Sequence, residues 1–184
     1  EARKMKVKAD VPLDALYKSW HMYPRLDKRY HATDLITDIL SGGGSSRLFQ
    51  ALVKEKKLFS NVECYHHGTV DAGLVSFDGK LVKGVKMEDA EKALMEVLED
   101  MKQNAVSENE LQKVKNKTES MLAFEDMSVM SRANSLAYYE LLGDAALMNS
   151  ELEKYQSVTT KDILEESRKI FDEKNSNTLY YYAN

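Results

Sequence analysis

The feature that most constrains the fold of this 184-residue chain is a run of three glycines at residues 42–44. Apolar residues recur at helical spacing on both sides of the run: Leu35, Ile36, Ile39 and Leu40 before it, and Leu48, Phe49, Leu52 and Val53 after it. Glycine adopts positive φ readily, and Ser45 or Ser46 can cap the free N–H groups of a following helix. The pattern therefore predicts a helix, a tight turn and a second helix. A phosphate-binding loop is disfavoured, because neither Gly-Lys-Ser/Thr nor a spaced Gly-x-Gly-x-x-Gly follows.

The composition is that of an ordinary globular protein and excludes several classes of function. Hydrophobic residues make up 43% of the chain and charged residues 30%, and the length fits one domain. A net charge of −4 favours neither nucleic acid nor an anionic membrane as a partner. No apolar run approaches the ~20 residues of a membrane-spanning helix. We expect a soluble protein, and its compartment stays open between the bacterial periplasm and the cytoplasm.

The order of predicted elements indicates an α+β domain. We expect strands at residues 15–23, 61–67, 73–81 and 178–182. We expect helices at residues 27–40, 45–57, 87–101, 107–122, 128–142 and 147–158, and a last one that Thr160 caps. The segments 107–122 and 128–142 form either two helices or one bent helix. The order β-α-α-β-β-α-α-α-α-β is typical of an antiparallel sheet with helices packed on one face.

The two ends of the chain differ in character. Residues 1–12 are charged and extended in pattern, which suggests a linker from a preceding domain, whereas residues 13–184 form one domain.

Ser107 and Glu110 have the spacing of a capping box at a helix start. Cys64, the only cysteine, alternates with Val62 on a predicted strand and is interpreted as a small buried residue rather than a reactive thiolate.

Four segments, in order along nearly the whole chain, carry a family resemblance. Residues 39–60, 71–74, 106–111 and 158–163 resemble the second, non-zinc domain of the pitrilysin and mitochondrial-processing-peptidase family of zinc metallopeptidases. The resemblance implies a metallopeptidase-domain-like fold. It also implies a sister domain or subunit that holds zinc on a helical His-x-x-Glu-His motif.

None of the four histidines of this chain fits that zinc motif. His66 and His67 are neighbours on a predicted strand, so their side chains point to opposite faces. We therefore interpret the histidines as structural, predict no catalytic residue and no metal or other cofactor in this chain, and expect it to be inactive alone.

One pair of residues is a candidate for substrate binding. Arg132 and Tyr139 lie two turns apart on a predicted helix, so both project from one face. Spacing alone favours a surface arginine and a core tyrosine, with Tyr138 competing for the role. By the resemblance, Arg132 and Tyr139 match an Arg…Tyr pair that reaches toward the zinc domain and hydrogen-bonds the peptide backbone of the substrate.

The sequence thus predicts the non-catalytic C-terminal domain of a pitrilysin-like zinc metalloendopeptidase, forming the wall opposite the zinc domain and helping to bind peptide. One alternative is an inactive peptidase-like partner or scaffold subunit that pairs with a separate zinc-bearing chain. Another is an α+β interaction module of unrelated ancestry.

Overall fold

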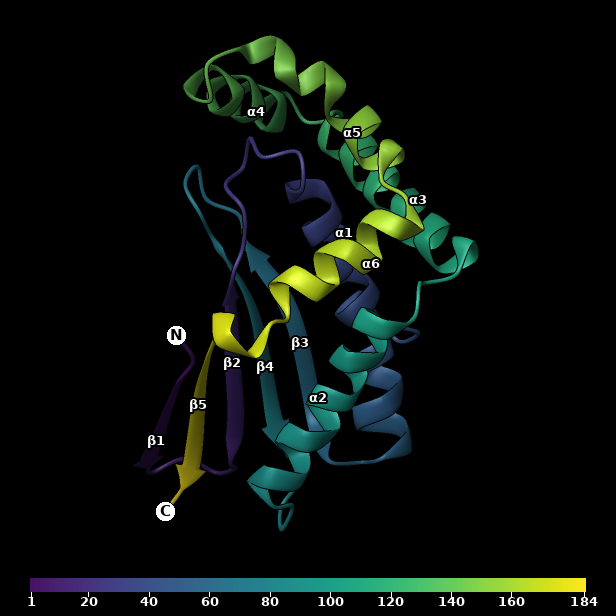
Figure 1. Ribbon diagram of the computed structural model, residues 1–184. Helices are drawn as coiled ribbons and strands as arrows, with labels where there is room; N and C mark the ends of the chain where they lie inside the picture. Colours follow the sequence, from purple (N-terminus) through teal and green to yellow (C-terminus); the bar gives the residue numbers. More distant parts are fainter.

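The computed structural model describes residues 1–184 as a five-stranded sheet with helices on one face (Figure 1). The strands are β1 (Arg3–Ala9), β2 (Ala15–His21), β3 (Phe59–His67), β4 (Leu74–Leu81) and β5 (Ser176–Ala183). The α-helices are α1 (Tyr30–Ser41), α2 (Met87–Gln103), α3 (Glu108–Glu125), α4 (Val129–Leu141), α5 (Glu151–Ser157) and α6 (Thr160–Ile170). A π-helix, η1 (Phe49–Glu55), and two short 3₁₀ helices, η2 (Ala145–Ser150) and η3 (Glu173–Asn175), complete the chain. The predicted α+β class is confirmed.

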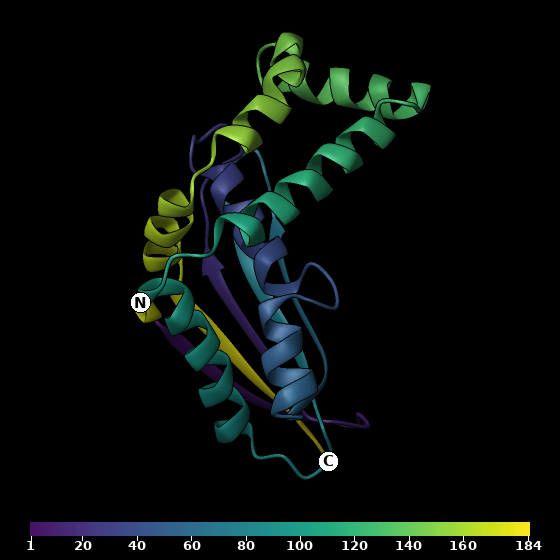
Figure 2. The same ribbon diagram turned by 90° about the vertical axis from the view of Figure 1, so that its right-hand side faces the viewer.

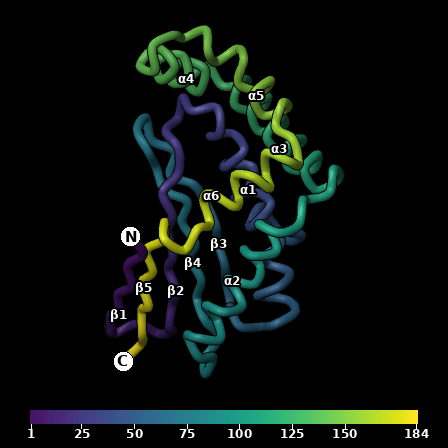
Figure 3. Tube along the Cα trace, in the orientation of Figure 1, coloured from purple at the N-terminus to yellow at the C-terminus, as the bar shows by residue number.

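The strand order in the sheet is β1-β5-β2-β4-β3. β3 and β4 form the antiparallel hairpin that the sequence predicts, and β2 pairs antiparallel with both β4 and β5. The final strand, β5, therefore lies inside the sheet, and both chain termini lie in the β1–β5 region (Figure 3).

Strand β1 lies within the segment that we expected to be a linker. It pairs in parallel with β5 from Arg3 to Ala9, so most of residues 1–12 belong to the sheet. Its charge is compatible with this place because an edge strand is solvated, and lysines are typical of protected edges. Lys4 lies 3.8 Å from Glu91 of α2. The charged composition therefore concealed a strand.

The core lies between the sheet and the helices. Alternate residues of the central strands, including Leu16, Trp20, Val75 and Phe77, are fully buried against the helical layer. Helix α6 packs against both α1 and α2, which completes this layer. The intervening residues of β2 and β4 face the other side of the sheet, which no helix covers (Figure 1).

The glycine turn forms as predicted, but the helix after it differs in type. α1 ends at Ser41, and Gly43 has φ +111°, a conformation that side chains with a Cβ rarely adopt. Within the predicted helix 45–57, residues 49–55 form a π-helix, in which the N–H of Lys56 donates to the carbonyl of Ala51 five residues back. The apolar spacing indicates which side faces the core, but it does not distinguish the two helical hydrogen-bond patterns.

The predicted capping box at the start of α3 is only half formed. Ser107 Oγ accepts the N–H of Glu110 at 3.2 Å. The Glu110 carboxylate instead binds the Arg47 guanidinium with two hydrogen bonds of 2.9 and 2.8 Å. A charged two-point contact is stronger than a bond to a neutral amide, so the ion pair replaces the second half of the box.

The outer edge of β3 is closed near its middle by a side chain from α1. Ser41 Oγ accepts the N–H of Cys64 and donates to its carbonyl, both at 2.9 Å. Cys64 itself is buried, as predicted, and burial raises the pKa of its thiol to about 12.

Helices α3 and α4 are separate, which resolves the ambiguity left by the sequence. The chain turns after α3, and Ser128 caps α4 by accepting the N–H of Ser131 at 3.2 Å. Together, α3, α4, η2 and α5 form a helical arm, residues 108–157, that extends beyond the sheet (Figure 2).

Candidate functional site

The candidate site lies where the helical arm meets the rest of the domain. Tyr139 of α4 is only 8% exposed, and its hydroxyl accepts a hydrogen bond of 2.9 Å from Arg25 Nη2. Arg132, on the same helix, is exposed, and its side chain has no hydrogen bond or ion pair. The structure thus places the two predicted residues in different environments, one in a buried contact and one at the surface.

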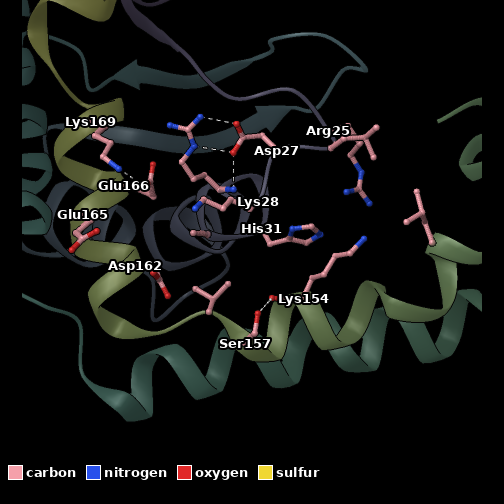
Figure 4. Close-up of a pocket in the computed structure, with 15 residues that line it drawn as sticks. Arg25, Asp27, Lys28, His31, Lys154, Ser157, Asp162, Glu165, Glu166 and Lys169 are labelled. Atoms are coloured by element: carbon pink, nitrogen blue, oxygen red, sulfur yellow. Dashed lines mark hydrogen bonds and ion pairs between the residues drawn. The ribbon is translucent and has the colours of Figure 1, made fainter. Parts of the chain in front are cut away.

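Arg25 connects Tyr139 to a buried carboxylate. Its guanidinium also donates to Glu151 at the start of α5, and His31 Nε2 lies 3.1 Å from the same carboxylate oxygen. Glu151 is 5% exposed. These four residues, named here the Arg25 network, join the loop before α1 to the arm at two points, α4 and α5. Arg25 and His31 are among the residues labelled in Figure 4.

A second group of polar contacts adjoins the Arg25 network. Asp34 of α1 accepts a hydrogen bond from the Tyr155 hydroxyl, and His66 Nδ1 of β3 lies 2.9 Å from Asp34. The other nitrogen of His66 is 3.0 Å from the Tyr30 hydroxyl. Gly68 is required beside this hydroxyl, because a Cβ there would lie 2.0 Å from it. These contacts hold α5 and β3 against α1.

The surroundings of these groups lower the pKa values of the two carboxyl groups and raise that of the Tyr139 phenol. Burial alone would raise the pKa of Glu151, but the hydrogen bond from His31 and the charge of Arg25 outweigh it and lower that pKa to about 2. Asp34 behaves alike: burial opposes ionisation, yet its contacts with His66 and Tyr155 lower its pKa. Burial and the charge of Glu151 raise the pKa of Tyr139 well above its usual value. At neutral pH Glu151 and Asp34 are therefore ionised and the Tyr139 phenol is protonated.

This shift predicts that acid weakens the domain. Because the pKa of Glu151 is about 2 in the folded state and 4.5 ordinarily, its contribution to stability is complete above pH 4.5 and is lost as pH falls toward 2. The difference corresponds to about 3 kcal/mol. Urea unfolding at several pH values should show this loss, and Glu151→Gln should remove much of the pH dependence. An unchanged slope in that variant would contradict the assignment.

The donor groups of this chain do not fit a zinc site. Among all residues, no group of three His, Cys, Asp or Glu side chains could hold a metal ion. His31 and His66 each contact a carboxylate within the protein, as expected of structural histidines. No helix of the structure is both long and apolar enough to cross a membrane.

The far part of the helical arm exposes an unusual number of large apolar side chains. They are Met121, Phe124, Met127, Val129, Met130, Leu136 and Leu141. Phe124 is 73% exposed and Val129 is 82% exposed. Tyr138, the competing phenol, is half-buried, and its hydroxyl makes no hydrogen bond, although its ring contacts that of Tyr139.

Sequence reasoning missed Arg25 and Glu151, the residues that hold Tyr139 in place. Both are charged residues in segments whose pattern resembles a solvated surface, and they lie 126 positions apart. The only local signal was that Arg25 follows Pro24 at the end of a predicted strand. Their partnership depends on how the arm folds back, which residue spacing does not reveal.

Solved structures share this fold at low sequence identity. A protease from Helicobacter pylori matches with a TM-score of 0.91 and 22% identity over 98% of this chain, which spans 44% of that protein. The inactive peptidase domain of a zinc protease from Bordetella parapertussis matches with a TM-score of 0.85 and 20% identity, covering 95% of both chains. The periplasmic protease PqqL from Escherichia coli matches with a TM-score of 0.74 and 13% identity over 99% of this chain and 21% of its own. No curated protein sequence matches. The chain therefore has the fold of a zinc-protease inactive domain and spans less than half of the H. pylori protease.

The sequence assigns the chain to a family directly. The family described as the peptidase M16 inactive domain matches residues 1–118, more than half of the chain. The chain belongs to this family, which confirms the resemblance to zinc metallopeptidases and excludes an interaction module of unrelated ancestry.

Proposed function

We propose that this domain is the non-catalytic half of an M16-type zinc peptidase and that a sister domain or subunit carries the zinc. It forms the wall opposite that partner and helps to bind the peptide substrate. Family membership and the absence of a zinc-fitting donor set support this division of roles.

The observation that carries the peptide-binding role is the surface around Arg132. Its guanidinium is exposed and has no protein partner, so its donors are available for peptide carbonyl groups. Val129 and Leu136, three residues before it and four after it, lie on the same helix face and are exposed. This surface offers hydrogen-bond donors beside apolar contacts, as an extended peptide requires.

Tyr139 can help to bind peptide only if its hydroxyl becomes accessible. Its phenol stays protonated at neutral pH, so it can act as a donor. The Tyr139 side chain is nearly buried and bound to Arg25. Its hydroxyl can therefore contact a peptide only if the helical arm moves relative to the rest of the domain. Arg132 is therefore the first residue to test.

Arg132→Ala should lower peptide turnover by the enzyme that the domain forms with its zinc-bearing partner. Loss of a charged hydrogen bond of about 1.5–3 kcal/mol corresponds to a decrease in kcat/KM of roughly 10- to 150-fold. The matched control is Arg3→Ala on β1, which is also exposed and is remote from the arm. Equal turnover in the two variants would remove Arg132 from the proposal.

A further inference from the structure

The free end of the helical arm carries three of the nine methionines of this chain. Met121 lies near the end of α3, Met127 lies in the turn between α3 and α4, and Met130 lies in the first turn of α4. This turn is the part of the arm that projects away from the sheet (Figure 2). These three residues, named here the arm methionines, are therefore close together at one end of the molecule.

The arm methionines are open to solvent, whereas most of the other methionines are not. Their exposed fractions are 78% for Met127, 70% for Met130 and 48% for Met121. Met5 of β1, at 63%, is the only other exposed methionine. The remaining five are buried or half-buried: Met22, Met87, Met95, Met101 and Met148. An oxidant in solution thus meets mainly the arm methionines of the folded chain.

An exposed thioether reacts with hydrogen peroxide. The sulfur lone pair attacks one peroxide oxygen, the O–O bond breaks and an S–O bond forms, while the proton of the transferred oxygen passes to the departing hydroxide to give water. The sulfur loses two electrons and the peroxide gains them. The product, methionine sulfoxide, is polar, and methionine sulfoxide reductases reverse its formation. Cys64 does not compete for the oxidant, because it is buried and burial raises the pKa of its thiol to about 12.

The arm methionines adjoin the surface around Arg132. Met130 follows Val129 on α4, and Met127 lies two residues before Val129, so the exposed apolar surface continues from α4 into the turn. The methionine side chain is flexible and polarizable, which lets it adapt to different apolar groups. A sulfoxide at the same place presents a polar S–O group instead.

We propose that the arm methionines are a reversible oxidation site and that their conversion to sulfoxides weakens the binding of apolar peptide segments. The effect on peptide binding rests on the proposed function, whereas the oxidation itself does not. Because the three side chains lie at the surface, their oxidation changes binding and leaves the packed core intact.

Brief treatment of the folded domain with hydrogen peroxide, followed by digestion and mass spectrometry, tests the oxidation site. The arm methionines and Met5 should be oxidised at least about tenfold faster than Met22, Met87 and Met101. The urea midpoint of the oxidised domain should equal that of the untreated domain. Similar rates for exposed and buried methionines, or a midpoint lowered by oxidation of the exposed ones, would overturn the proposal. This measurement needs no peptide, so its outcome is independent of the result for Arg132→Ala.

Turnover of fluorescein-labelled casein, an unfolded protein, by the enzyme that the domain forms with its zinc-bearing partner tests the effect on binding. Oxidation should lower kcat/KM by roughly three- to tenfold, mainly through KM, and methionine sulfoxide reductases should restore it. The combined variant Met121→Leu, Met127→Leu and Met130→Leu keeps apolar side chains of similar volume. It should turn over casein as the native enzyme does and should keep this activity after oxidation.

Met5→Leu is the matched control, because it removes an exposed methionine that is remote from the arm. This variant should lose activity on oxidation as the native enzyme does. The proposal is refuted if the combined leucine variant is inactivated by peroxide as strongly as the native enzyme. It is refuted equally if the native enzyme keeps its turnover while its arm methionines are oxidised. In either case a decrease in turnover by Arg132→Ala would still support the proposed function.

Discussion

Glu151→Ala should lower the free energy of unfolding by about 3–5 kcal/mol, because it removes the acceptor of the buried Arg25 guanidinium. Both side chains of this ion pair are less than 10% exposed. His31 would lose its carboxylate partner in the same variant. Urea unfolding at neutral pH, followed by circular dichroism, measures the loss.

Glu153→Ala is the control for that variant. Glu153 lies two residues further along α5, is exposed and makes no ion pair, so its replacement should change stability by no more than about 0.5 kcal/mol. A loss below about 1 kcal/mol for Glu151→Ala would mean that the Arg25 network does not stabilise the contact between the helical arm and the rest of the domain.

Trp20→Ala should destabilise the domain by a similar amount, about 3–5 kcal/mol. Trp20 of β2 is completely buried, and its ring meets Phe171, after α6, edge to face at a centroid distance of 5.1 Å. Truncation leaves a large void between the sheet and α6, where the core is closely packed. The shift in the urea midpoint gives the measurement.

Trp20→Phe separates packing from polarity at the same position. The indole Nε1 is buried without a hydrogen-bond partner, so phenylalanine removes an unsatisfied donor while it keeps an aromatic ring against Phe171. We expect a loss of no more than about 2 kcal/mol. A loss as large as that of Trp20→Ala would show that the ring volume of tryptophan, not apolar contact in general, is required there.

Helices and strands were predictable where a periodic pattern of apolar residues ends at a glycine turn or begins at a capping residue. The glycines at residues 42–44, the hairpin of β3 and β4 and the cap at Ser107 all appear where the sequence predicts them. The last helix also forms where we expected it, but its cap is Thr159, which exchanges hydrogen bonds with Asp162, and not Thr160 as predicted. Such features depend on neighbours a few residues apart, and that is the range over which sequence patterns carry information.

Long-range partnerships were not predictable in the same way. The lysine-rich pattern of β1 resembles a linker because an edge strand is solvated, and only its pairing with β5 reveals its place. Arg132 and Tyr139 share a helix face by spacing, yet Arg25, from a distant loop, decides that the Tyr139 hydroxyl lies in a buried contact. Their role in peptide binding remains a prediction, and the Arg132→Ala experiment tests it.

The bonds between Ser41 and Cys64 have a consequence for how this domain can meet other chains. Both backbone groups of Cys64 are occupied by one hydroxyl, so a polypeptide laid alongside β3 would find no partner at that rung of the ladder. The hydroxyl thus interrupts, at Cys64, the row of free backbone groups along which a second chain could extend the sheet beyond β3.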